Sequence, residues 1–74
     1  MRIELSDPGL VSELRLFLQR NSCPSEQWGQ DMFEVRVLRS PGELRSEADD
    51  RMKVFGHLRE WCAEHPGVKA NILG

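Results

Sequence analysis

The stretch from Met32 to Leu38 constrains the fold of this chain more than any other. Its side chains alternate between apolar and charged; the apolar ones are Phe33, Val35 and Val37, and the charged ones are Glu34 and Arg36. Successive side chains of a β-strand leave opposite faces of a sheet, so a period of two indicates a strand with one buried face. We therefore expect residues 32–38 to form a central strand on which helices pack.

Both ends of the chain show the same alternation. Residues 2–6 and 68–73 are each predicted to form a strand, because apolar and polar side chains take turns along them. The residues expected to point inward are Ile3, Leu5, Val68, Ala70 and Ile72.

Residues 22–30 are open to two interpretations. One is a loop. The other, which we prefer, is an edge strand from Cys23 to Trp28 that turns through residues 28–31 into the central strand. Pro24 fits an edge strand, because proline has no N–H to donate to a neighbouring strand.

An amphipathic helix is predicted after the first strand. Asp7 is the expected N-cap and Pro8 the first helical residue, where the missing N–H would be unpaired in any case. Asn21 is expected to take the left-handed conformation that ends the helix. The apolar face comprises Leu10, Val11, Leu14, Phe17 and Leu18, and Leu16 falls outside it.

A second amphipathic helix includes residues 50–63, and two starts compete for it. Both Ser40–Glu43 and Ser46–Asp49 have the spacing of a capping box, in which a side chain at each end bonds the backbone of the other. Pro66 ends the helix, because the residue before proline is disfavoured in the α conformation. The residues expected to be buried are Val54, Phe55, Leu58, Trp61 and Cys62, extended toward the N-terminus by Ala48 and Met52.

This order predicts an α+β protein with a ferredoxin-like βαββαβ topology, a four-stranded antiparallel sheet and two helices on one face. The 74 residues are expected to form a single domain, 1–74. On the open face, Glu4 and Arg36 are expected to pair across strands. Cys23 and Cys62 fall at opposite ends of the sheet, beyond the reach of a disulfide, so we expect two thiols.

Composition argues against several kinds of partner. Ten Lys and Arg residues against twelve Asp and Glu residues give a net charge of −2, without the basic field that nucleic-acid binding needs. No apolar run is long enough to cross a membrane. The first residues lack the pattern of a signal peptide, so we expect a cytoplasmic protein.

No catalytic or metal-binding constellation stands out, and we expect a non-enzymatic protein with no cofactor and no metal. Cys62 and His65 lie three residues apart, but no further zinc ligands follow them. Cys23 has no orienting base within its own element that would activate its thiol. His57 is expected on the solvent side of its helix.

Trp28 is the side chain that most suggests a contact surface. It lies beside a predicted turn, close to the loop at Asp7, and tryptophan at a rim often contributes to binding. Simple packing at the sheet edge is the alternative. Trp61 is expected to contribute to the core.

Residues 5–11, which read Leu-Ser-Asp-Pro-Gly-Leu-Val, precede an amphipathic helix and Asn-Ser-Cys at 21–23. This opening resembles ACT-type regulatory domains, and the resemblance implies a βαββαβ fold, a dimer, and a small metabolite or amino acid bound near Asp7 and Gly9. Trp28 and His65 complete the candidate ligand-binding set, because the predicted topology brings them to the same end of the sheet. His-Pro-Gly at 65–67 also resembles small bacterial proteins, a likeness that implies no role.

The leading expectation is therefore a non-enzymatic domain that binds a small molecule at a homodimer interface. The alternative is a protein–protein interaction module that acts through an edge strand. An acylphosphatase-like enzyme would need an arginine in the first turn, which offers Asp7 and Gly9 instead. RNA binding would need aromatic side chains on the open face, whereas Phe33 is expected to point inward.

Overall fold

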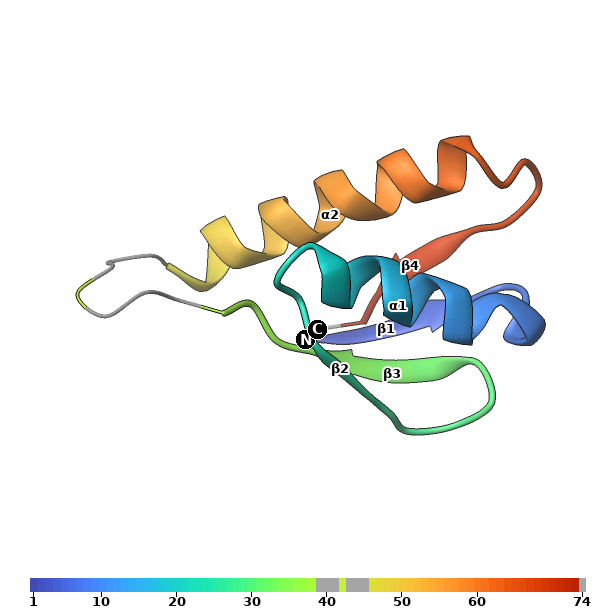
Figure 1. The fold of residues 1–74 in the computed structure, drawn as a ribbon, viewed down its shortest axis with the longest axis horizontal. Helices are drawn as coiled ribbons and strands as arrows, with labels where there is room; N and C mark the ends of the chain where they lie inside the picture. The colour runs from blue at the N-terminus through green and yellow to red at the C-terminus, as the bar shows by residue number, and fades with distance from the viewer. Residues whose placement is uncertain (39–41, 43–45, 74) are drawn as a thin grey trace.

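A computed structural model describes residues 1–38, 42 and 46–73 (Figure 1). Two α-helices and four strands follow in the predicted order, with a short 3₁₀ helix before the first α-helix. The elements are β1 (Arg2–Leu5), η1 (Pro8–Leu10), α1 (Val11–Arg20), β2 (Ser25–Gln27), β3 (Met32–Val35), α2 (Glu47–Ala63) and β4 (Ala70–Ile72).

The four strands form one antiparallel sheet in the order β2-β3-β1-β4, which confirms the predicted α+β class. The two edges are therefore β2 and β4. The register pairs Arg2 with Glu34 and Glu4 with Met32, so the predicted pairing of Glu4 with Arg36 is wrong. The strand pairing sets Glu4 opposite Met32, beyond the reach of residue 36.

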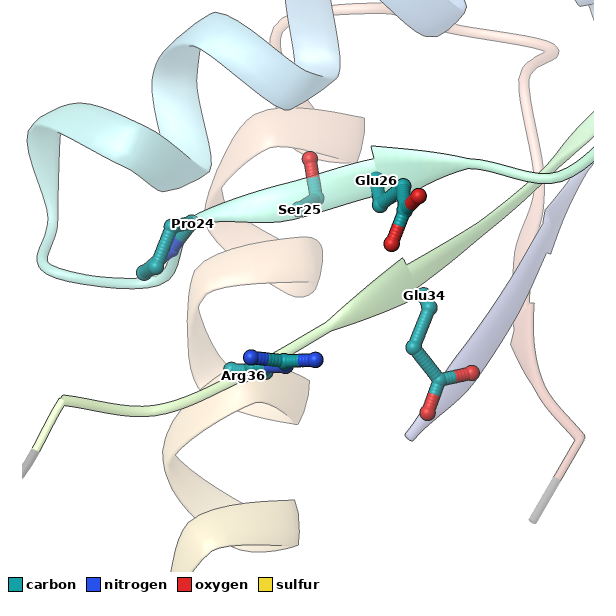
Figure 2. A pocket seen from close by; sticks show the side chains of 5 residues that line it. All are labelled: Pro24, Ser25, Glu26, Glu34 and Arg36. Carbon is teal, nitrogen blue, oxygen red and sulfur yellow. The ribbon is translucent and has the colours of Figure 1, made fainter.

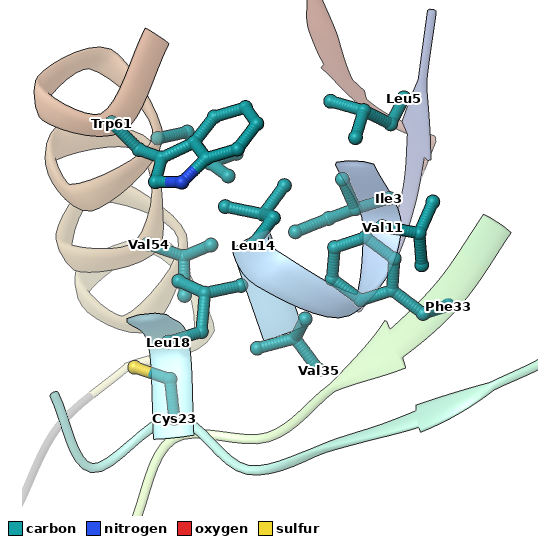
Figure 3. Close-up of a cluster of buried hydrophobic side chains, with 11 residues drawn as sticks. Ile3, Leu5, Val11, Leu14, Leu18, Cys23, Phe33, Val35, Val54 and Trp61 are labelled. Atoms are coloured by element: carbon teal, nitrogen blue, oxygen red, sulfur yellow. The ribbon is translucent and has the colours of Figure 1, made fainter. Parts of the chain in front are cut away.

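The core lies between the sheet and both helices (Figure 3). It contains side chains from β1, β3, α1 and α2, which places the two helices on the same face of the sheet. No polar or charged side chain of the described residues is buried. The buried residues are Ile3, Leu5, Val11, Leu14, Leu18, Cys23, Phe33, Val35, Val54, Leu58 and Trp61.

The predicted buried face of α2 is too wide. Val54, Leu58 and Trp61 are buried, but Met52 is 75% exposed and Phe55 is 53% exposed. A stripe at spacing 0, 4, 7 is enough to cover the sheet, so apolar residues one step around the helix are left at its side. Ala48 is exposed as well.

The start of the first helix follows the prediction and its end does not. The carboxylate of Asp7 accepts a hydrogen bond from Gly9 N at 3.0 Å, capping η1, which leads directly into α1. At the other end, Ser22 takes the left-handed conformation, with φ of 64°, and Asn21 does not. The Asn21 side chain instead donates to Phe17 O at 2.8 Å, which satisfies a carbonyl of the last turn.

Of the two predicted starts for α2, the structure has the later one. Ser46 and Asp49 form a reciprocal capping box, with side-chain-to-backbone distances of 3.2 and 3.1 Å. This satisfies backbone N–H groups that a helix leaves unpaired at its start. The earlier box, Ser40–Glu43, lies outside the described residues.

The predicted edge strand exists but is shorter than residues 23–28, and β3 ends at Val35 and not at Leu38. Both differences meet at Pro24. Arg36 N donates to Pro24 O at 2.9 Å, but proline has no N–H to return a second bond, so the regular ladder is interrupted there, although Leu38 N still donates to Ser22 O at 3.1 Å.

Hydrogen bonds confirm the predicted end of the sheet where three loops meet. Leu5 N donates to Asp31 O, and Ser6 N donates to Lys69 O, both at 2.8 Å. The turn after β1 thus joins the β2–β3 hairpin tip to the entry of β4. Both cysteines are thiols, with Cys23 buried after α1 and Cys62 half-buried near the end of α2.

Candidate functional site

The outer edge of β4 presents backbone groups to its surroundings. Leu73 N donates to Arg2 O and Ser6 N donates to Lys69 O, each at 2.8 Å. Because hydrogen-bonded and non-hydrogen-bonded pairs alternate along an antiparallel ladder, the backbone groups of Ala70 and Ile72 point away from β1. These are the groups with which a further strand would pair.

A groove runs beside this edge, between β4 and one side of α2, which lie next to each other in Figure 1. It consists of two adjoining hollows of about 410 and 300 Å³ that share Phe55, Ala70 and Asn71. We call the whole the β4 groove. Its apolar lining comes from Met52, Phe55, Leu58 and Cys62 of α2 and from Val68, Ala70 and Ile72.

The helix wall of the groove is a second apolar stripe on α2. Met52, Phe55 and Cys62 are spaced 0, 3, 10, so they lie on one side of the helix, beside the stripe that faces the core. Single exposed apolar residues are ordinary, but a contiguous apolar strip next to an unpaired strand edge is a typical feature of an interaction surface.

The charged residues that line the β4 groove all carry the same sign. They are Arg51 and Arg59 on α2 and Lys69 before β4, and no carboxylate belongs to the lining residues of either hollow. The chain as a whole has a net charge of −2. The groove is therefore a local basic region on a slightly acidic protein.

The other edge of the sheet, β2, is covered by a side chain of α1. Arg15 Nη2 donates to Ser25 O and Arg15 Nε to the Ser25 hydroxyl, both at 3.0 Å, and Nη1 reaches Gln27 Oε1 at 3.3 Å. The register directs the Ser25 carbonyl away from β3, to the side where a further strand would add. The planar guanidinium makes several of these bonds at once.

A hollow on the open face of the sheet lies over β2 and β3 (Figure 2). Glu26 and Glu34 are opposite each other in the register, with Arg36 beside them. The pKa of Glu34 is lowered, chiefly because its carboxylate accepts a 2.9 Å bond from the Met1 ammonium; partial burial opposes this, and the charges of that ammonium, Arg2 and Arg36 add to it. A carboxylate held ionised in this way suits an ion pair better than proton transfer.

Trp28 lies on the same open face. The Arg2 guanidinium is 4.5 Å from the centre of its ring, and the ring is 60% exposed. A cation over an exposed ring contributes about 0.5–1 kcal/mol. The ring contact of Trp28 is thus with Arg2 of β1, and a role for Trp28 beside the Asp7 loop stays a prediction.

The other predicted ligand-binding residues each have a partner of their own. Asp7 binds the backbone of Gly9, as described above. The His65 ring stacks on Trp61 with 3.9 Å between centroids, and its Nε2 is 3.8 Å from a Glu13 carboxylate oxygen. It remains a prediction that one ligand site combines Asp7, Gly9, Trp28 and His65.

His57 differs from the expectation of a solvated side chain. It is half-buried, and its ring meets that of Phe17 edge-on at 6.3 Å. Among the described residues, no group of three or more His, Cys, Asp or Glu side chains is arranged to hold a metal ion.

Sequence reasoning missed the β4 groove and the arginine that covers β2. The signal for the groove was present in the pattern of α2. Seven apolar residues were assigned to one buried face, which is more than a stripe over a four-stranded sheet can bury, and the surplus Met52 and Phe55 form the groove wall. Nothing in the sequence indicated that Arg15 would reach β2.

No protein-family model, no curated protein and no solved structure matches this chain. Within the part of the chain that the structure describes, no helix is long and apolar enough to cross a membrane.

Proposed function

We propose that this chain is a non-enzymatic protein-interaction module that binds an extended segment of another polypeptide along the outer edge of β4. One observation carries the proposal: the outer edge of β4, with which no described strand pairs, and the exposed apolar stripe of α2 lie side by side in one groove. In strand addition, main-chain bonds to a sheet edge give affinity, and pockets for alternate side chains give specificity.

The two parts of the groove match the two needs of an added strand. The outward backbone groups of Ala70 and Ile72 would pair with its main chain. Every second side chain of the strand would turn toward α2 and cover Met52 and Phe55. Covering apolar surface contributes about 25 cal/mol per Å², which must offset the entropy lost when a flexible segment is held in place.

We further infer that the arrangement is ferredoxin-like. The strand order β2-β3-β1-β4, the antiparallel pairing and the alternation of strands and helices support this. In such an arrangement the last strand is an edge, and its outer side is open unless another segment covers it.

Two proline variants test the function. Ala70→Pro removes an N–H that points outward, and Asn71→Pro removes one that the register directs toward Glu4. We expect Ala70→Pro to remain folded and to lose strand addition, and Asn71→Pro to be destabilised. A display library of random heptapeptides is selected on the wild type, and each selected peptide is then measured against both variants.

The expected result is a set of peptides that shift the amide resonances of residues 68–73 in the wild type and bind Ala70→Pro at least tenfold more weakly. The proposal is wrong if no selected peptide depends on Ala70. It is equally wrong if the shifts fall on β2, because that edge is the one that Arg15 covers.

A further inference from the structure

Three features fix the kind of segment that fits the β4 groove: its length, its apolar pattern and the charge around it. The inference below rests on the proposed function and names its partner class.

The length follows from the helix wall. Met52 and Cys62 are ten residues apart on α2, which is about 15 Å along the axis at 1.5 Å per residue. An extended chain covers that length with about five residues, and about seven would overlap both ends.

The apolar pattern follows from the two walls. The side chains of Ala70 and Ile72 in β4 are half-buried beside α2, whereas that of Asn71 is exposed. An added strand has the same pleat as β4, so its alternate side chains would fall beside Phe55 and its neighbours. Those positions suit aliphatic side chains, and the intervening positions face solvent.

The charge decides between a second copy and another protein. Arg51, Arg59 and Lys69 line the groove, without a carboxylate among the lining residues. A second copy that paired β4 with β4 would bring the same three cations to the interface, and like charges placed together cost affinity. A segment with carboxylates complements them.

We propose that the β4 groove binds an extended, acidic segment of another protein, about five to seven residues long, with aliphatic side chains at alternate positions. The aliphatic side chains cover Met52 and Phe55, and the carboxylates face Arg59 and Lys69. The attraction is strongest at low ionic strength, since partly exposed charges are screened by salt.

Three synthetic heptapeptides, capped at both ends, test the partner class. Valine alternates with glutamate in the first, with serine in the second and with lysine in the third. Affinity for the full chain is measured by amide titration at low and at physiological salt. We expect the glutamate peptide to bind at least about tenfold more tightly than the lysine peptide at low salt, with the serine peptide between them.

A charge-reversed variant sharpens the test. In Arg59→Glu combined with Lys69→Glu, the order of the glutamate and lysine peptides should reverse. The matched control is Arg20→Glu with Lys53→Glu, which makes the same change of charge at exposed residues that do not line the groove. The control should keep the wild-type order.

The outcomes separate this inference from the proposed function. If the lysine peptide binds as tightly as the glutamate peptide, or the reversed variant keeps the wild-type order, the acidic partner is wrong. If none of the three binds while library peptides need Ala70, the partner class alone fails. If sedimentation shows a dimer that Ala70→Pro abolishes and peptides do not dissociate, the occupant is a second copy.

Discussion

The two edges of the sheet differ in how they treat their outer backbone groups. At β2, the Ser25 carbonyl is bound by Arg15 Nη2 at 3.0 Å, and Pro24 interrupts the ladder just before the strand. At β4, the outward backbone of Ala70 and Ile72 lies beside an apolar groove with exposed Met52 and Phe55. One edge is covered from within the chain, and no described segment covers the other.

This difference matters because an uncovered edge is a template for unwanted pairing. Natural sheets protect their edges with proline, charged side chains or short strands. Both edge strands are only three residues long, but β2 carries Glu26 and is contacted by Arg15, whereas β4 has no proline or charged side chain among its own residues, although Lys69 lies directly before it.

The largest expected effect is a difference in stability between substitutions in the buried stripe of α2 and in its exposed stripe along the groove. Leu58→Ala should lower the free energy of unfolding by about 2–5 kcal/mol, because this side chain is 3% exposed and its loss leaves a cavity. Phe55→Ala should change it by less than about 1 kcal/mol, because the ring is already half-exposed. Urea denaturation measures both. Equal losses would mean that the groove wall is part of the core, and the comparison of the edges would fail.

The second effect tests whether the hydrogen bonds of Arg15 to β2 stabilise the fold. Arg15→Ala removes three hydrogen bonds to Ser25 and Gln27 and should destabilise the fold by about 1–2 kcal/mol. Arg15→Lys should not restore it fully, because an ammonium cannot reproduce the guanidinium fork.

Peptide titration of the same variant sharpens the comparison. If Arg15 protects the edge, Arg15→Ala should show new peptide-induced shifts at residues 25–27, beside those at β4. Shifts that stay confined to β4 would mean that Arg15 is not the residue that keeps peptides away from β2.

The third effect uses the two thiols as reporters. Cys62 lines the β4 groove and is half-buried, whereas Cys23 is 0% exposed in the core. Iodoacetamide should modify Cys62 at least about tenfold faster, because alkylation needs an accessible thiolate. A groove-binding peptide at saturation should slow the alkylation of Cys62 and leave the alkylation rate of Cys23 unchanged. If both rates fell, the peptide would be stabilising the whole fold and not occupying the groove.

The fold could be predicted because its signals are local. Alternation in residues 32–35 and the capping residue Asp7 act within a few positions of the chain, and the structure has both as predicted; Ser46 caps α2 as one of the two starts that the sequence left open. The missed details depend on pairing between distant elements. The register that sets Arg2 opposite Glu34, and not Glu4 opposite Arg36, is fixed by the packing of whole strands.

The site was harder to predict for the same reason. An apolar residue on a helix looks the same in sequence whether it faces the core or a partner, so Phe55 and Leu58 were assigned alike. Arg15 reads as an ordinary exposed charge on a helix until the position of β2 is known. Edge protection is a property of the assembled sheet.

The smallest expected effect is a loss of stability at low pH on the β2–β3 side of the sheet, where Glu34 lies. Glu34 is paired with the Met1 ammonium at 2.9 Å and lies 3.9 Å from Arg2, and its pKa is lowered, first by that bond. A carboxyl whose pKa is lower in the folded state stabilises the fold above its unfolded pKa, and this stability is lost as the pH falls through the folded pKa. We therefore expect stability to decline as the pH falls below about 4.5, and Glu34→Gln to reduce that decline.

The measurement is the urea midpoint at pH 7 and pH 3 for the wild type and the variant. Glu26→Gln is the matched control, because it changes the carboxylate opposite Glu34 and leaves the bonds to Met1 and Arg2 in place. If the wild type and Glu34→Gln lose the same stability between the two pH values, the ion pair does not hold this side of the sheet. The lining residues of the β4 groove include no carboxylate, so acid should change the β4 edge least.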